Sequence, residues 1–232
     1  MSDIVEHLEQ EGFYLLRGAA TVAEVASLQG ILGQADIARS ERGGETYGAR
    51  GLLQLLEVHA VANLPAIAAA LCAVMGDGFR AVRGLFFDKT QGANWPVLWH
   101  QDLSLAVRER YDLPGWNNWS IKRGTHHVQP PPEILARLVT LRLHLDDCPA
   151  ENGALRVLPA SHRQGILSRD AIRDIGDDRA RAITAEAGDA LLMRPLILHA
   201  SRPAQAPTHR RVLHLEFAPD DLLPAGLTWA EG

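Results

Sequence analysis

Cysteine is scarce in this chain, which has only Cys72 and Cys148 among its 232 residues. Two cysteines so far apart provide neither a disulfide framework nor the paired thiols of a zinc ribbon. No apolar run is long enough to cross a bilayer, and the first residues lack the basic and then apolar pattern of a secretion signal. We therefore expect a soluble, cytoplasmic protein that has no contact with a membrane.

Positive charge is also in short supply, because 23 lysines and arginines stand against 28 aspartates and glutamates, without any basic tract. A chain of this kind cannot neutralise a phosphate backbone, so nucleic acid is not an expected partner. The hydrophobic share of 47% is that of a globular protein with a substantial core. Without internal repeats or linkers, the sequence predicts one domain over 1–232, acting on a small molecule as a monomer or homodimer.

The N-terminal third shows helical periodicity interrupted by glycine. A capping-box pair, Thr21 and Glu24, begins one of the helices. The expected elements here are helices at 3–11, 21–35 and 61–75, a strand at 12–18 and a polar loop at 40–50.

After Gly78 the pattern changes to short strands separated by turns. The expected strands are at 80–88, 137–145, 154–158, 190–193, 197–200 and 212–217. We therefore predict a mainly β fold with flanking helices, in which helices from about 1–78 pack on an antiparallel jelly roll formed by about 79–220. The segment 103–132 shows little periodicity, and long irregular segments of this kind are commonly lids.

Histidine has the one unusual count, with 10 residues, and one of these histidines stands in a metal-binding pattern. His100 and Asp102 flank Gln101 after a strand, and side chains two apart on an extended backbone project to the same side. They would supply two ligands of the two-histidine, one-carboxylate triad that holds Fe(II) with positions left open. Residue spacing alone leaves the third ligand open among His126, His127, His144, His162 and His199.

A wider pattern then becomes recognisable. It consists of the sequence His100-Gln101-Asp102, of His199 with Ser201, of Arg210, and of the runs 152–162 and 188–192. From Gly12 onward, and most strongly between Arg83 and Phe217, this chain resembles the phytanoyl-CoA dioxygenase family of Fe(II)/2-oxoglutarate-dependent oxygenases.

The resemblance implies a double-stranded β-helix, the cupin-like form of the jelly roll. It implies that His100, Asp102 and His199 hold Fe(II), and that Arg210 and Ser201 bind the far carboxylate of the cosubstrate 2-oxoglutarate. With O2, such an enzyme decarboxylates 2-oxoglutarate to succinate and hydroxylates a small organic substrate. Related halogenases have a small residue in place of the carboxylate, so Asp102 argues against halogenation.

Two arginine positions each allow more than one interpretation. Where some members of the family carry a tryptophan near the cosubstrate, this chain has Arg142, on the same polar strand face as Thr140. We predict that this face lines the cosubstrate pocket, and that Arg142 binds either the cosubstrate or a carboxylate of the substrate. Strand alternation places only one of Arg210 and Arg211 inside, and the family match favours Arg210.

The substrate is predicted to be small and anionic. Lys89, Arg83 and Arg50 are the basic candidates for its recognition. Trp116 either contacts the substrate or anchors the 103–132 segment to the body. Two alternatives remain: a cupin-type metal enzyme that uses no 2-oxoglutarate, and a ligand-binding jelly roll without catalytic turnover.

Overall fold

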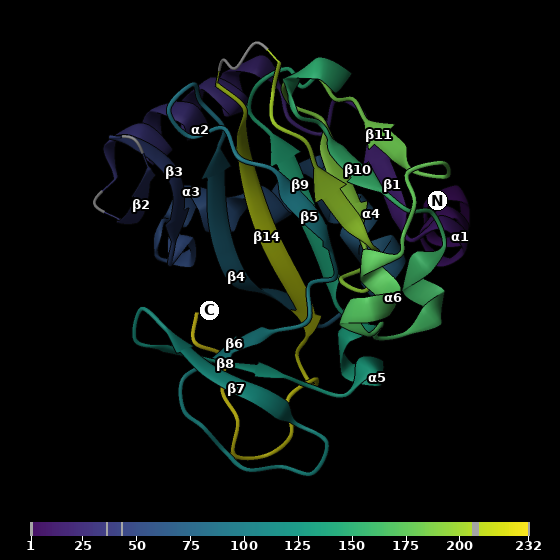
Figure 1. Ribbon diagram of the computed structural model, residues 1–232. Coiled ribbons are helices and arrows are strands. Elements are labelled where there is room, and N and C mark those ends of the chain that lie inside the picture. The colour runs from purple at the N-terminus through teal and green to yellow at the C-terminus, as the bar shows by residue number, and fades with distance from the viewer. Residues whose placement is uncertain (1, 36, 43, 206–208, 232) are drawn as a thin grey trace.

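Two antiparallel sheets face each other in the computed structural model, which describes residues 2–35, 37–42, 44–205 and 209–231 (Figure 1). The large sheet has the order β1 (Phe13–Leu16), β12 (Ala190–Met193), β9 (Val139–His144), β14 (Arg211–Pro219), β4 (Phe79–Asp88), β3 (Glu45–Arg50) and β2 (Ala38–Arg42). The small sheet has the order β11 (Arg181–Ile183), β10 (Leu155–Val157), β13 (His199–Ser201) and β5 (Val97–His100). The predicted mainly β jelly roll is confirmed, and the large sheet also draws three strands from residues before 79.

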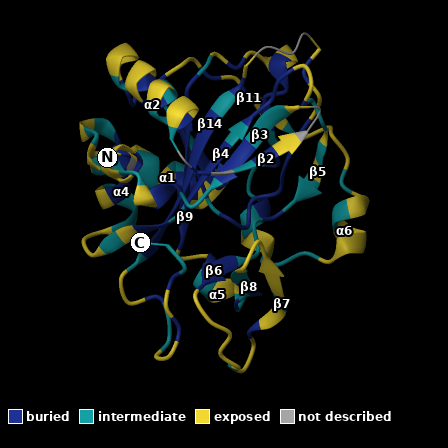
Figure 2. Ribbon diagram, turned by 90° about the vertical axis from the view of Figure 1, so that its left-hand side faces the viewer, coloured by how far each residue is buried: buried dark blue, intermediate teal, exposed yellow. Residues whose placement is uncertain are grey.

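Helices cover the outer face of the large sheet, with their exposed residues turned outward (Figure 2). They are α1 (Ser2–Glu11), α2 (Val22–Gln34), α3 (Leu56–His59) and α4 (Pro65–Met75), joined by 3-10 turns at Leu52–Gln54 and Ala60–Asn63. The capping box at the start of α2 is confirmed, since the Thr21 backbone N–H donates to Glu24 and the Glu24 N–H donates to Thr21. Leu141 and Leu215 of the sheet share one apolar core with these helices, which makes this the main burial surface.

Among the described residues, no single helix is long and apolar enough to cross a membrane. Two consecutive helical stretches, Leu56–Asn63 and Pro65–Met75, are long and apolar enough only when taken together, and the chain bends by 67° between them. Val58, Val61, Ile67 and Leu71 of these stretches are buried in the main core.

The predicted loop at 40–50 is wrong, because the structure places the β2–β3 hairpin there. β3 pairs with β4, with Gly48 opposite Phe87 and Arg50 opposite Leu85. A strand near the edge of a sheet can be polar on both sides, so its sequence lacks the apolar alternation that predicts a strand.

The irregular lid predicted at 103–132 is also wrong in its local structure. The segment forms a third sheet of β6 (Leu105–Val107), β8 (Thr125–Gln129) and β7 (Asn117–Lys122), followed by α5 (Pro132–Leu135). The β7–β8 turn places Arg123 and Gly124 at φ 50° and 82°, the left-handed pair that a tight two-residue hairpin requires. Arginine is an uncommon residue at such a turn, which is why the sequence did not indicate a hairpin.

Strand register divides the inner face of the large sheet into an apolar and a polar part. Across five neighbouring strands, one row of opposed residues reads Leu191, Arg142, His214, Leu85 and Arg50. On the Leu191 side, the two sheets close on an apolar cluster of Phe13, Leu155, Val157, Ile183, Leu191, Met193 and Ile197. Beyond Leu191 the same row turns polar, and this change places a polar cavity between the sheets.

Two short helical segments complete the described chain next to the small sheet. They are the 3-10 turn Ser161–Gln164 and α6 (Arg169–Arg173). Another 3-10 turn, Ala150–Asn152, comes before β10.

Candidate active site

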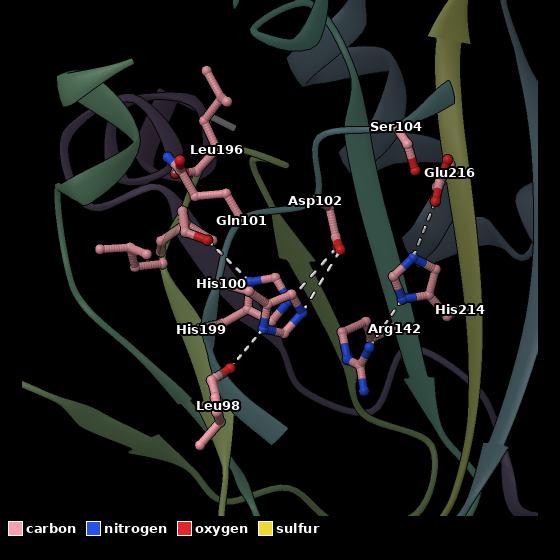
Figure 3. Close-up of polar contacts among 12 residues, drawn as sticks. Leu98, His100, Gln101, Asp102, Ser104, Arg142, Leu196, His199, His214 and Glu216 are labelled. Carbon is pink, nitrogen blue, oxygen red and sulfur yellow. Dashed lines mark hydrogen bonds and ion pairs between the residues drawn. The ribbon is translucent and has the colours of Figure 1, made fainter. Parts of the chain in front are cut away.

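His100, Asp102 and His199 meet at the inner side of the small sheet (Figure 3). His100 ends β5, and its backbone lies directly opposite His199, the first residue of β13. The Nε2 atoms of His100 and His199 lie 3.9 and 3.6 Å from the Asp102 carboxylate oxygens. One ligand atom from each residue falls within 4.8 Å of the others, so the three atoms can share one cation.

Backbone carbonyls orient both imidazoles. His100 Nδ1 lies 2.9 Å from the Leu98 carbonyl oxygen, and His199 Nδ1 lies 2.9 Å from the Ile197 carbonyl oxygen. A carbonyl only accepts hydrogen bonds, so each Nδ1 carries the proton and each Nε2 keeps a free lone pair for a metal.

Gln101 points away from its neighbours and holds this end of β5 in place. Its buried amide N–H groups donate to the Gly165 and Leu196 carbonyl oxygens at 2.8 and 2.7 Å. Its amide oxygen accepts a bond from the Leu167 N–H at 2.9 Å. Asp102 is tied by its own N–H to the Pro195 carbonyl oxygen at 3.0 Å. The three-residue sequence thus combines two candidate metal ligands with one residue that positions them.

The protonation states of the triad suit a cation. Burial raises the pKa of Asp102, but electrostatic interactions with His199, His214 and other basic neighbours outweigh burial and bring that pKa to about 2. Burial lowers the pKa of His199 to about 4, in spite of the opposing effect of Asp102. At neutral pH the carboxylate is therefore ionised and His199 is neutral, as metal binding requires.

Two buried cations lie side by side at the inner end of the cavity. Lys89 and Arg210 continue the β4–β14 ladder, each N–H bonding to the other's carbonyl. Lys89 is 1% exposed, and its Nζ donates to Ser201 Oγ and to the Arg202 carbonyl oxygen, both at 2.9 Å. Arg210 is 5% exposed and donates to the Gly153 carbonyl oxygen.

No carboxylate among the described residues forms an ion pair with either cation. The buried Nε of Arg210 has no hydrogen-bond partner within this part of the chain. A buried cation pair with a spare donor is costly in isolation, so the arrangement is suited to an anionic ligand.

Arg142 begins a line of polar contacts along the inner face of the large sheet (Figure 3). It lies 2.9 Å from His214 Nδ1, His214 Nε2 lies 3.6 Å from Glu216, and Glu216 pairs with Arg83 at 3.0 Å. Arginine cannot accept a hydrogen bond, so it donates to His214 Nδ1, and His214 presents its Nε2 proton to Glu216. The line connects the inner end of the cavity with its outer end.

The His–Asp–His cluster, the Lys89–Arg210 pair and the line of contacts from Arg142 to Arg83 border one cavity of about 280 Å³. Its lining consists of Arg50, Arg83, Leu85, Phe87, Lys89, Trp95, Val97, His100, Asp102, Ser104, Lys122, Arg142, Leu155, His199, Ser201, Arg210, His214 and Glu216. The structure thus brings together most of the predicted site residues: the three metal-ligand candidates, together with Arg50, Lys89, Arg142, Ser201 and Arg210.

Three predicted or alternative residues lie elsewhere. Thr140 is buried on β9 but is not part of the cavity lining. Trp116 is buried in a second apolar core below the jelly roll, so it anchors the 103–132 segment and does not reach the cavity. Arg211 turns to the opposite side of β14 and holds Asp146 with two bonds of 2.8 and 2.6 Å.

Sequence reasoning passed over several lining residues. Glu216 and His214 share the strand face of Arg210, so alternation could have indicated both. Lys122 comes from the third sheet, and no local pattern in the sequence places it beside the jelly roll.

Comparisons with known proteins agree with this geometry. Residues 8–212 match the family described as phytanoyl-CoA dioxygenase. No curated protein is a significant sequence match.

Solved structures show the same fold at low sequence identity. The 2-oxoglutarate-dependent epimerase SnoN from nogalamycin biosynthesis is 17% identical, with a TM-score of 0.65, and the alignment covers 97% of this chain and 90% of SnoN. HygX from Streptomyces hygroscopicus, solved with nickel and 2-oxoglutarate, is 17% identical, with a TM-score of 0.67 and coverages of 95% and 88%. The non-heme monooxygenase ThoJ is 18% identical, with a TM-score of 0.69 and coverages of 99% and 84%.

The family match spans most of the chain, and the His–Asp–His cluster lies in one cavity with Ser201 and Arg210. This protein belongs to the phytanoyl-CoA dioxygenase family of Fe(II)/2-oxoglutarate-dependent oxygenases.

Proposed function

We propose that this protein hydroxylates a small anionic organic substrate while it decarboxylates 2-oxoglutarate to succinate. The observation that carries the proposal is the shared cavity, in which a His–Asp–His cluster stands opposite a buried lysine–arginine pair that has no carboxylate partner among the described residues. A metal enzyme without a dicarboxylate cosubstrate has no need of that pair.

His100, Asp102 and His199 would hold Fe(II). The donor set fits this ion, because two neutral imidazoles and one carboxylate on one side leave the other side free. When bound, Fe(II) supplies the reaction with O2 that oxidises 2-oxoglutarate and substrate. The chain's own contribution is to hold Nε2 of both histidines toward the ion through the Leu98 and Ile197 carbonyls.

Arg210, Lys89 and Ser201 would bind the far carboxylate of 2-oxoglutarate. A guanidinium offers a carboxylate two parallel N–H bonds, and the unpartnered Nε of Arg210 provides one such donor. Lys89 adds a second positive charge and orients the Ser201 hydroxyl, to which it donates. Arg202 fastens Lys89 from the other side through its carbonyl oxygen.

Arg142 would hold a carboxylate between the cation pair and the triad. It lines the same cavity as Arg210 and Asp102, and electrostatic interactions couple it to both. Arg142 donates one N–H group to His214 Nδ1, while the buried Nε of Arg142 has no partner among the described residues. That free donor supports a role in binding the cosubstrate or a carboxylate of the substrate.

The proposal is tested with the anaerobic protein. Fe(II) and 2-oxoglutarate together should produce a weak visible charge-transfer band, and admission of O2 should yield succinate in proportion to the 2-oxoglutarate consumed. A band that is absent at saturating ligand would favour a cupin-type enzyme that does not use 2-oxoglutarate. A band without oxygen-dependent succinate would indicate a ligand-binding protein.

Affinity for 2-oxoglutarate should fall as pH rises above neutrality. Burial, and then the neighbouring charge of Arg210, lower the pKa of Lys89 to about 7. A bound carboxylate favours the charged lysine and raises this pKa, so binding above pH 7 must take up a proton. We expect affinity to weaken by up to about tenfold for each pH unit above about 7. Calorimetry in buffers of different ionisation enthalpy measures the proton uptake.

Lys89→Met provides the comparison for this pH dependence. The variant should bind 2-oxoglutarate weakly at every pH and without the proton uptake. An unchanged pH profile in Lys89→Met would show that another group is responsible.

A further inference from the structure

A second group of cations lies at the outer end of the cavity, away from Lys89 and Arg210. It consists of Arg50 on β3, Arg83 on β4 and Lys122 on β7, and we call it the outer set. Arg50 and Arg83 are half-buried and Lys122 is exposed, whereas the cations at the inner end are buried. All three line the same cavity as His100 and Asp102.

Strand pairing and a hairpin turn bring the outer set together. Arg50 stands opposite Leu85, in the sheet row that contains His214, and Arg83 stands opposite Glu216 in the next row on the same face. Lys122 arrives from the third sheet at the end of β7, just before the Arg123–Gly124 turn.

A contact with the edge of the large sheet fixes that turn. The Arg123 guanidinium donates to the Arg39 carbonyl oxygen on β2 at 2.9 Å. This bond holds the end of β7, and with it Lys122, against the β2–β3 hairpin that carries Arg50.

The outer set is only partly neutralised by the protein. Glu216 pairs with Arg83 at 3.0 Å, while Glu231 accepts bonds from the Gly84 and Leu53 N–H groups and stands near Arg83. Arg50 and Lys122 form no ion pair with any described residue. Burial and the charge of Arg83 lower the pKa of both Arg50 and Lys122, so the three charges act on one another at close range.

We infer that the outer set binds an oxyanion of the substrate, a carboxylate or a phosphate monoester, and thereby holds the substrate beside the metal ligands. This inference rests on the proposed function, because 2-oxoglutarate would occupy the inner cations and leave the outer set for another ligand. Three donors from two separate sheets suit a group with several acceptor oxygens. Glu216 offsets one of the three charges.

The test uses anaerobic protein loaded with Fe(II) and saturating 2-oxoglutarate, so that the inner cations are occupied. Propionate and methyl phosphate are titrated separately by calorimetry, as probes of a carboxylate and a phosphate monoester. We expect the wild type to bind at least one probe, and the tighter one identifies the oxyanion. Lys122→Met and Arg50→Met should each weaken that binding about tenfold, the loss of one charge-assisted contact.

Arg173→Met is the matched control, because it removes the same charge from exposed α6, outside the cavity. It should bind the probe as the wild type does. The inference is overturned if the wild type binds neither probe, or if the outer-set variants and the control bind it equally. The charge-transfer band of the same samples reports 2-oxoglutarate binding, so its absence would instead contradict the proposed function.

Discussion

Replacing His199 or Asp102 by alanine should reduce oxygen-dependent succinate formation to the level of an enzyme-free mixture. Each substitution removes one of the three candidate ligands that the described residues offer, and with it the geometry proposed to hold Fe(II). The loss should be visible first in binding, as failure to retain stoichiometric Fe(II) under anaerobic dialysis, and then in the assay for succinate.

The fold should survive these substitutions. His199 contributes one imidazole hydrogen bond, to the Ile197 carbonyl, and Asp102 is partly exposed, so we expect a cost of about 2 kcal/mol or less in unfolding free energy. His59→Ala, an exposed histidine on α3, is the control and should keep full activity. Substantial succinate formation by His199→Ala would show that the triad is not the metal site.

Arg210→Ala should raise the KM for 2-oxoglutarate about 100-fold, while its neighbour Arg211→Ala should leave this KM unchanged. Arg210 lies buried in the cavity, and its Nε has no partner among the described residues; loss of a buried charge-assisted pair costs about 3 kcal/mol. Arg211 lies on the other side of β14, where it pairs with half-buried Asp146. Steady-state kinetics with varied 2-oxoglutarate measures both values.

The order of the two variants should be reversed for stability, with Arg211→Ala losing more than Arg210→Ala. Arg211→Ala breaks a two-bond ion pair and should lower the melting temperature by about 2–4 °C. Arg210→Ala relieves an unpaired buried charge and should cost less. If Arg211→Ala raised the KM and Arg210→Ala did not, the assignment of the two arginines would be reversed.

Local pattern determined much of the fold, because the relevant physics acts between residues close in sequence. The capping box at Thr21 and the alternation of β9 each reflect contacts within one element, and both were predicted correctly. The β2–β3 hairpin and the third sheet were missed. Their strands are polar or short, so they lack the apolar alternation that predicts a strand.

By itself the sequence determined that His100 and Asp102 project to one side, since this follows from strand geometry over three residues. Only the tertiary structure decided that His199 lies opposite His100, that Arg210 rather than Arg211 faces the cavity, and that Trp116 does not. It also brought Lys122 to the outer end. These outcomes depend on the register between strands far apart in the chain, which packing of the whole molecule sets and no local window contains.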